Sequence, residues 1–415
     1  MKLADKKRSI LLIATLILWF TFISMTKNAF SAAMVYIVDE GFLTKAQTGT
    51  IVATFYLIYA SLQFSGGVLA DRWKPDLLIT VGYIGAGIAN LIIYLNHSYH
   101  VMLITWSLCA VIQAPVWPSV LKLVSTRTHK DHQSRGIYFI SFANTGGAML
   151  IYLVSALLPS WEHNFLMSAC GLIFFGVLWE CIRRILCPHT DTAIRKKTST
   201  PAEPSPQTKT LPKRALLGVL PILLLLGLLR GIFDTGVKGL IPTMINDSYS
   251  NLSPSISNIL NVLVILAGLL GIILSHYIYP HFFKVQTTAL LALMSLATLP
   301  TLVLLGIGRL HYAIIVAMLA LISLLMCGAS LLINYISSFF DWWNLGGRVA
   351  GLCNCVSALG IVISNYVFPK TSELIGWIGT VRIWVVLIIL TALSALLLIP
   401  AWKRFLKKYP PHHYH

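Results

Sequence analysis

Long apolar segments recur along the whole chain, and each is long enough to cross a lipid bilayer as a helix. A span needs about 20 mainly apolar residues, because a helix rises about 1.5 Å per residue and the hydrocarbon layer is about 30 Å thick. Twelve such segments fit the 415-residue sequence. They are residues 9–36, 46–69, 77–96, 101–124, 137–159, 165–183, 215–244, 256–279, 286–307, 311–337, 349–369 and 379–402. The predicted fold class is an all-α polytopic membrane protein.

Composition agrees with the apolar segments. Only 11% of the residues are charged and 57% are hydrophobic, whereas a soluble domain has about 25% charged residues. This excludes a soluble enzyme, a disordered protein and a secreted disulfide scaffold. Residues 184–214 are rich in Pro, Thr, Ser and Lys, and such a stretch buries too little apolar surface to order itself. We therefore predict a six-helix bundle at 1–183, a linker at 184–214, a second six-helix bundle at 215–402 and a tail at 403–415.

The basic residues divide unevenly between the two sides of this arrangement. The chain has 31 Lys and Arg against 14 Asp and Glu, a formal net charge of +17. With both termini and the linker on one side, 24 basic residues fall on that side and four on the other. Because cytoplasmic loops carry the excess of Lys and Arg, both termini are predicted to be cytoplasmic, in the inner or plasma membrane. Topology accounts for the net charge, so nucleic acid is not an expected partner.

This count assigns basic residues at the ends of spans, such as Arg183, to the loops, and it leaves three, Lys27, Arg230 and Lys238, well inside the predicted spans. A charge at mid-bilayer costs at least about 2.5–3.5 kcal/mol, so such a residue indicates a functional site by default. Lys27 and Arg230 take near-equivalent places in the first span of each half, and a two-fold-related arrangement would direct both towards one cavity. Two such cations predict an anion site, with Arg230 able to form a bidentate fork. The alternative is a side chain that extends to the interface, which is favoured for Lys238.

Asp234 is the one carboxylate well inside a predicted span. It lies four residues after Arg230 and four before Lys238, so helical spacing places all three on one face. It could be a fixed counter-ion of these cations. It could instead compete with substrate for Arg230 and take up a proton during transport.

The loop between the second and third spans carries a motif. It reads Gly66-Gly67-Val68-Leu69-Ala70-Asp71-Arg72-Trp73-Lys74-Pro75 and resembles the GxLaDRxGRR signature of the major facilitator superfamily. Gly67, Asp71 and Arg72 are predicted to form a conformational motif: glycine lets two helices approach closely, while Asp71 and Arg72 could pair and cap helix ends differently in different conformations. With twelve spans and a mid-chain linker, this resemblance implies the major facilitator fold of two six-helix bundles.

Within that superfamily, four further segments resemble motifs of the organophosphate:phosphate antiporters, the group of the glycerol-3-phosphate and hexose-phosphate transporters. The matches cover nearly the whole chain and correspond to the family patterns RKNF…AMPYL…GF, QGxxWP, RG…HNxGG and RxGI. In this sequence they are Lys27–Met34 with Gly41-Phe42, Gln113–Pro118, Arg135-Gly136 with Asn144–Gly147, and Leu228–Ile232.

The resemblance also implies roles for single residues. Arg230 falls on one of the two arginines that the family uses for the substrate phosphate, and the other falls on Thr26. A family His falls on Ala143, and a second-span Lys falls on Gln63. Because surplus buried charge must be matched, the smaller number of cations favours a less charged anion such as a sulfonate, a carboxylate or a monoanionic ester.

Further polar and aromatic residues in the spans complete the predicted substrate site. Each could instead serve in packing or in hydrogen bonds between helices, which are worth only about 0.6 kcal/mol on average. Beyond Lys27 and Arg230, the predicted substrate-binding residues are Thr26, Gln63, Tyr59, Gln113, Trp117, Asn144 and Asn354.

The predicted function is secondary active transport of a small organic anion by alternating access. The substrate is an organophosphate, sulfonate or carboxylate, with a sugar derivative among the candidates. Coupling is exchange for phosphate or symport with protons through Asp234, and the protein is expected to be a monomer in contact with membrane lipids. No enzyme motif, cofactor motif or metal-ligand spacing is present in the sequence, and Cys353 and Cys355 are too close for a metal finger. The alternatives are a drug or lipid exporter of the same fold and a non-transporting membrane sensor.

Overall fold

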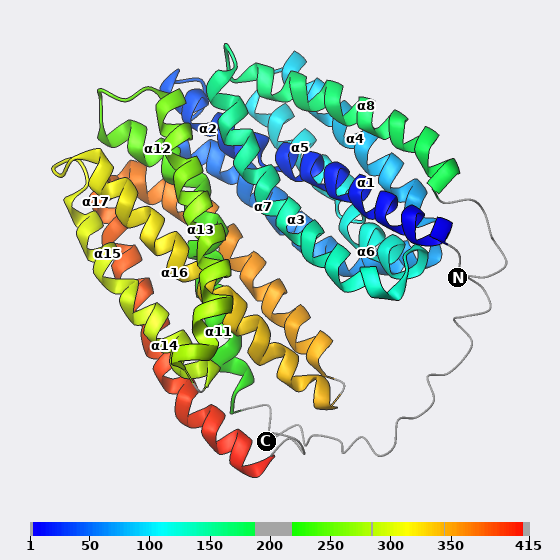
Figure 1. The fold of residues 1–415 in the computed structure, drawn as a ribbon. Coiled ribbons are helices and arrows are strands. Elements are labelled where there is room, and N and C mark those ends of the chain that lie inside the picture. The colour runs from blue at the N-terminus through cyan, green and yellow to red at the C-terminus, as the bar shows by residue number, and fades with distance from the viewer. Residues whose placement is uncertain (1–2, 187–217, 284, 344, 410–415) are drawn as a thin grey trace. The chain divides into compact units, whose positions relative to one another are not determined.

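The computed structural model describes residues 3–186, 218–283, 285–343 and 345–409. In these residues the chain is helical almost throughout and has no strand (Figure 1). From residue 187 on, the predicted linker lies outside the described residues, as do the last six residues of the predicted tail. The chain divides into two compact units, Met1–Glu203 and Pro204–His415.

The described residues of unit 1 form eight helices that make six spans. Two of these spans are broken, the first at Asn28 and the fourth at Ala114–Pro115, and α3 bends by 50° between Gln63 and Ser65. The helices are α1 (Leu3–Lys27), α2 (Ala29–Asp39), α3 (Lys45–Arg72), α4 (Pro75–Leu95), α5 (Tyr99–Gln113), α6 (Val116–Arg127), α7 (Lys130–Leu157) and α8 (Glu162–Leu186).

Unit 2 also makes six spans from its described helices. Its first span is α11 (Leu220–Gly231), the π-helix η1 (Ile232–Gly236) and α12 (Val237–Ser248). The second span is α13 (Pro254–Phe282). The third consists of α14 (Gln286–Leu296), α15 (Thr298–Val303) and the 3₁₀ turn η2 (Leu304–Gly306). The fourth is α16 (Tyr312–Ser338), and it is followed by the 3₁₀ turn η3 (Phe339–Trp343). The last two spans form α17 (Gly346–Lys408), which reverses at Gly376.

Local chemistry explains several helix ends. Thr44 caps α3 in a reciprocal capping box with Gln47, and Ser253 accepts a hydrogen bond from Ile256 at the start of α13. These caps satisfy backbone N–H groups that have no partner within the helix. Gly376 has φ +71°, a left-handed conformation that glycine adopts without steric cost. It therefore allows the chain to turn sharply between the last two spans.

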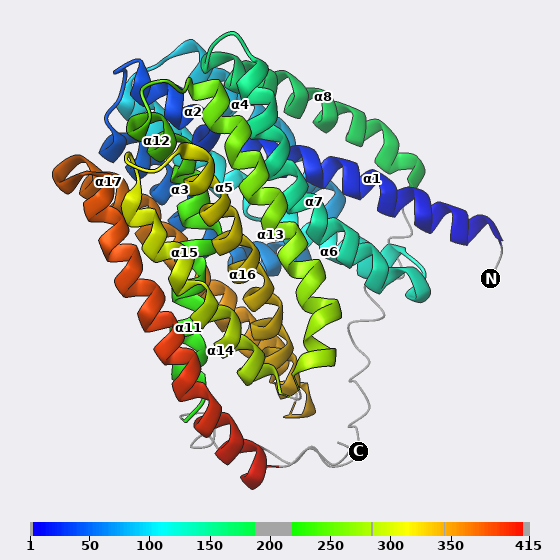
Figure 2. The ribbon, with the colours of Figure 1, turned by 60° about the vertical axis from the view of Figure 1, so that its left-hand side comes forward.

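All twelve predicted spans are present in the described part of the chain, mostly with ends within a few residues of the prediction. Among the larger differences, α7 begins at Lys130 where the predicted span begins at 137, and α17 continues to Lys408, which makes the first residues of the predicted tail helical. Within unit 2, α13 packs along α16 and α11 packs along α17 (Figure 2). Within unit 1, α1 packs along α7.

Glycines permit the close packing between the first and fifth spans of each unit. A Cβ on Gly147 of α7 would lie 2.7 Å from the Met25 amide nitrogen and 2.9 Å from the Ser24 Cβ of α1. In unit 2, a Cβ on Gly360 of α17 would lie 2.9 Å from the Ile232 amide nitrogen. Real Cβ contacts are longer than these distances. The backbones can therefore approach this closely only because these residues have no side chain.

We predict that Gly147→Ala lowers the free energy of unfolding of unit 1 by about 1–3 kcal/mol, because the added methyl group forces α1 and α7 apart. Thermal unfolding of the detergent-purified protein measures the change. Gly146→Ala is the matched control, since a Cβ on Gly146 has nothing within 4 Å. Equal melting temperatures for the two variants would contradict the packing described here.

Candidate functional site

Lys27 is the last residue of α1, directly before the break at Asn28. Its Nζ lies 3.2 Å from Oδ1 of Asn144 on α7 and 5.3 Å from the ring centroid of Tyr59 on α3. The ammonium group therefore contacts polar and aromatic groups of two neighbouring helices within unit 1. A hydrogen bond and a cation–π contact together replace part of the hydration that a membrane-embedded charge loses.

Tyr59 extends this cluster along α3. Its ring stacks on Phe55 with centroids 5.9 Å apart, and the side chain of Gln63, one turn further along α3, lies beside its hydroxyl. Four of the predicted substrate residues are thus brought together in unit 1, and we call Lys27, Tyr59, Gln63 and Asn144 the lysine cluster. Asn144 is exposed, while the other three are half-buried.

Asn28 is a neighbour of the lysine cluster that the sequence prediction missed. Its Nδ2 donates to the Ser24 carbonyl at 2.8 Å, and its Oδ1 accepts from the Tyr56 hydroxyl at 3.1 Å. The side chain thus satisfies a carbonyl group where α1 ends and ties that end to α3. The position was within the motif Lys27–Met34 that carries the resemblance, so this motif could have revealed it.

Three predicted residues of unit 1 have other surroundings. Thr26 is fully buried and its hydroxyl donates to the Ile23 carbonyl at 3.0 Å. Gln113 is 2% exposed and donates to the Cys109 sulfur at 3.2 Å within its own helix. The Trp117 ring packs against Phe20 with centroids 4.8 Å apart. The structure does not place these three among the residues of the lysine cluster.

Arg230 lies in the last turn of α11, directly before η1. The next residue, Gly231, packs against Ser357 of α17 so closely that a Cβ would lie 2.8 Å from the Ser357 Cα. Asn354, another predicted residue, lies one turn before Ser357 and is exposed. The side chain of Arg230 is half-buried. A π-helix is rare and occurs mostly as a single turn at functional sites.

The π-helix corrects the expected alignment of the residues around Arg230. Its i→i+5 hydrogen bonds rotate later residues relative to a regular α-helix, so Lys238 does not keep the regular helical register with Arg230. The side chain of Asp234 lies outside the described residues, and its backbone belongs to η1. Its role as counter-ion or proton carrier remains a prediction.

Lys238 does not extend to the interface as expected. Its Nζ donates to the Cys327 sulfur of α16 at 3.0 Å, and Asn261 of α13 donates to its backbone carbonyl at 3.1 Å. A Cβ on Gly268 of α13 would lie 3.1 Å from this Nζ. The missing side chain at Gly268 leaves room for the ammonium group between α13 and α16. The interior of unit 2 therefore accommodates the Lys238 side chain, which the position of this residue in the span did not reveal.

The loop motif after α3 is organised around Lys122 of α6. Its Nζ donates to the Ala70 carbonyl at 2.7 Å and lies 3.1 Å from Oδ1 of Asp71. A cation at a helix C-terminus stabilises the free carbonyl groups there. The described partner of Asp71 is thus Lys122, whereas the sequence suggested Arg72, which is exposed.

Of the two glycines in this motif, Gly66 is the one at which the helices approach closely. A Cβ on Gly66 would lie 3.1 Å from the Ala114 carbonyl oxygen and from the Pro115 Cα, whereas a Cβ on Gly67 has nothing within 4 Å. The helix contact therefore falls on the break of the fourth span.

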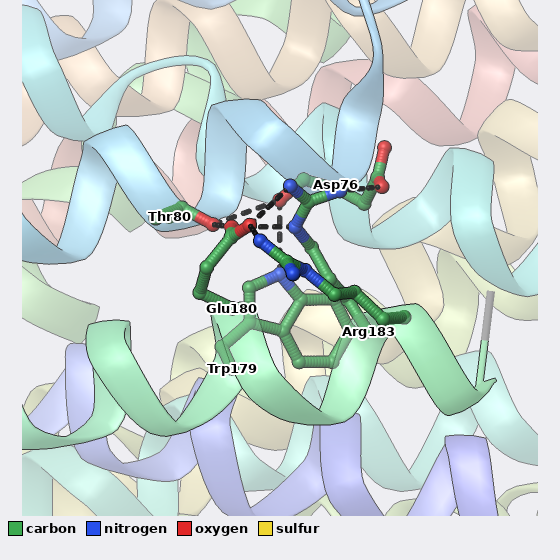
Figure 3. Close-up of polar contacts among 6 residues, drawn as sticks. Asp76, Thr80, Trp179, Glu180 and Arg183 are labelled. Carbon is green, nitrogen blue, oxygen red and sulfur yellow. Dashed lines mark hydrogen bonds and ion pairs between the residues drawn. The ribbon is translucent and has the colours of Figure 1, made fainter. Parts of the chain in front are cut away.

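A second charged cluster joins α4 to α8, and Figure 3 shows its residues converging. Nη1 of Arg183 donates to Oδ2 of Asp76 at 2.9 Å, and the guanidinium also binds the Glu180 carboxylate. Oε2 of Glu180 accepts from the Thr80 hydroxyl at 3.2 Å, and Trp179 donates to the Asp76 carbonyl at 2.9 Å. The sequence analysis had counted Arg183 as a loop cation, but its side chain is only 13% exposed.

The described residues contain no group of three or more His, Cys, Asp or Glu that could hold a metal ion. The cysteines among the described residues form no disulfide bond. The groups described above that could contact a ligand in these units are cations, amides, hydroxyls and aromatic rings. Such groups bind polar or anionic organic molecules.

Comparison with known proteins agrees with this architecture. The profile of the Major Facilitator Superfamily matches residues 11–365, and the chain belongs to this family. In overall fold it is similar to a bacterial homologue of the human lysosomal transporter Spinster in an inward-facing, unoccupied conformation. The TM-score is 0.77 at 16% identity, and the match covers 98% of this chain and 100% of that one. At this identity the likeness concerns the fold alone.

Curated relatives include proteins named for hexose phosphate. The membrane sensor protein UhpC of Escherichia coli K12 is 26% identical over 176 residues, which cover 41% of this chain and 39% of UhpC. The probable hexose phosphate transport protein of Chlamydia trachomatis is 26% identical over 170 residues, which cover 40% of this chain and 37% of that protein. The matched region thus spans about two fifths of these relatives. They confirm the resemblance to the organophosphate transporter group.

We predict that Arg183→Gln destabilises unit 1 by about 3–5 kcal/mol, because Asp76 would keep a buried charge without its cation. Melting of the purified protein measures this loss. Arg184→Gln is the matched control: Arg184 is 75% exposed and reaches Glu180 at 3.5 Å, so its removal should change stability by less than about 1 kcal/mol. Similar losses of stability for both variants would contradict a stabilising role for the cluster shown in Figure 3.

Proposed function

We propose that this protein is a secondary transporter for a small organic anion, and that Lys27 and Arg230 each bind the anion during the transport cycle. The observation that carries the proposal is shared by the two units. In each, the first span becomes irregular within two residues after a basic residue that lies within the span. Interrupted helices are how many transporters form substrate sites within a membrane.

The lysine cluster supports a singly charged, hydroxylated anion as substrate. Its one cation, Lys27, stands beside neutral groups, namely the amides of Asn144 and Gln63 and the hydroxyl of Tyr59. Amides and hydroxyls recognise the hydroxyl groups of a sugar, while the ammonium group of Lys27, acting with the guanidinium of Arg230, offers few positive charges and so matches an anion of low charge. Relatives named for hexose phosphate agree with a sugar derivative. The substrate classes that fit are a monoanionic phosphate ester, a sugar carboxylate and a sulfonate.

The proposal also covers the driving force for transport and the membrane location of the protein. Exchange for inorganic phosphate or symport with protons through Asp234 would supply the driving force. We place the protein in the inner or plasma membrane with both termini in the cytoplasm, as a monomer. A second candidate function is ligand sensing without transport, because UhpC, a relative at 26% identity, is named a membrane sensor.

A binding measurement tests the role of Arg230. Thermal shifts of the purified protein are recorded with inorganic phosphate, glucose 6-phosphate, glucuronate, sulfonates and lipophilic cations, since a ligand of the folded state raises the melting temperature. We predict that an anion stabilises the wild type and binds Arg230→Ala at least about tenfold more weakly, because a charge-assisted hydrogen bond is lost. Arg309→Ala, at an exposed loop residue, is the control. Stabilisation by cations alone would contradict the proposal and favour a drug exporter.

Gln63→Lys tests the assignment of substrate charge. The added ammonium group beside Tyr59 and Lys27 should raise the affinity for a doubly charged phosphate ester over a singly charged analogue by about tenfold, because one more opposite charge faces the ligand. Paired binding curves for glucose 6-phosphate and glucuronate measure the ratio. Gln63→Met, which removes the amide without adding charge, should leave the ratio near that of the wild type. An unchanged ratio in Gln63→Lys would separate Gln63 from the anion site.

A further inference from the structure

In unit 1, a tryptophan binds the residue that closes the first span. Glu40 caps the end of α2, and its Oε2 accepts from Nε1 of Trp161 at 2.9 Å. Trp161 directly precedes α8 and is 1% exposed. Its ring lies between His97 and Phe42, with centroids 4.9 and 5.5 Å away. The indole is thus fixed by packing, and its N–H group is directed at the exposed Glu40 carboxylate.

Unit 2 contains the same arrangement at the corresponding place. Asp247 lies in the last turn of α12, and its Oδ2 accepts from Nε1 of Trp377 at 2.8 Å. Trp377 follows Gly376, where the chain reverses before the sixth span of this unit, and it is 7% exposed. In both units, therefore, an exposed carboxylate that ends the first span binds a buried indole that begins the sixth.

Such a repeat is informative because indole nitrogen is only a donor and carboxylate oxygen only an acceptor. The paired residues are 121 positions apart in unit 1 and 130 in unit 2, so each bond closes a unit from its first span to its last. A buried indole N–H that loses its acceptor carries a desolvation cost. Each bond therefore favours one placement of the end of its half-helix.

We propose that Glu40–Trp161 and Asp247–Trp377 are positioning pairs that set the angle of the half-helices α2 and α12, and so the backbone that follows Lys27 and Arg230. The importance of this role for transport rests on the proposed function. α2 has 11 residues and α12 has 12, with Pro242 inside α12, so each is a helical arm of about 16–18 Å. One end of the arm meets the irregular backbone at Asn28 or η1, and the other end is held by the tryptophan.

Other hydrogen bonds also hold the half-helices α2 and α12, and they show what the tryptophan pairs add. The Tyr36 hydroxyl of α2 donates to the Ser155 carbonyl of α7 at 3.0 Å, so α2 is already tied to the fifth span. In unit 2, Asn261 of α13 donates to the Lys238 carbonyl near the start of α12. The tryptophan bonds supply the tie to the sixth span, at the far end of each arm. Release of this tie should therefore let the arm tilt about the break.

Hydrogen–deuterium exchange on the full-length protein in detergent tests this proposal without a substrate. Trp161→Phe keeps the aromatic packing and removes the N–H donor, and we expect amide exchange to rise about tenfold at residues 29–33, at the break end of α2. Trp377→Phe should have the same effect at residues 232–239. Glu40→Gln, which keeps an acceptor oxygen, should retain the wild-type pattern at 29–33.

Trp384→Phe is the matched control, since Trp384 is a buried tryptophan of α17 whose Nε1 has no hydrogen-bond partner among the described residues. Its exchange pattern at residues 232–239 should match that of the wild type. Faster exchange confined to residues 36–43 and 158–164 in Trp161→Phe would overturn the proposal, because the bond would then act only locally. Equal effects from Trp377→Phe and Trp384→Phe would overturn it as well.

The two proposals fail separately. If no anion in the panel binds the wild type but exchange rises at the breaks, the positioning pairs stand and the anion assignment falls. If an anion binds and Trp161→Phe leaves both exchange at 29–33 and the anion's dissociation constant unchanged, the positioning role falls and the anion assignment stands.

Discussion

A charge that enters an apolar helix bundle must find partners there, because water is absent and an isolated ion is costly. Much of the polar structure in the described residues answers this constraint. Lys27 is met by an amide and an aromatic ring, Lys238 by a thiol, and Arg183 by two carboxylates. The last arrangement is fully ionic and is suited to holding two helices together. The first has only neutral partners, which a substrate anion could outcompete.

The same design is used in each unit. A basic residue precedes an irregularity in the first span, a glycine brings the fifth span close to that irregularity, and a tryptophan binds the far end of the half-helix. Internal repeats of this kind are typical of transporter folds. The two irregularities differ in form, because one is a break at Asn28 and the other is a single π-helical turn. Packed elements lie on either side of each irregularity, so we expect each unit to change its backbone conformation at the irregularity.

Hydropathy and length predicted the twelve spans well, because a bilayer-spanning helix needs a long apolar run and few other structures can supply one. The resemblance identified the motifs that contain Lys27 and Asn144, but it did not predict the contact between these two side chains. What failed was any inference that depended on neighbours in space. Arg183 was counted as a loop charge because its partner Asp76 is 107 residues away. Lys238 was misjudged because helix packing, which sequence spacing does not reveal, decides which groups meet.

An anion that binds this protein should also be carried across the membrane, and a flux measurement tests this directly. The protein is reconstituted in liposomes loaded with inorganic phosphate, and entry of the anion that stabilises it is followed with a radiolabel. The account predicts accumulation that disappears in Arg230→Ala and persists in Arg309→Ala. Binding without flux, under outward gradients of phosphate and inward gradients of protons alike, would contradict transport and identify a sensor.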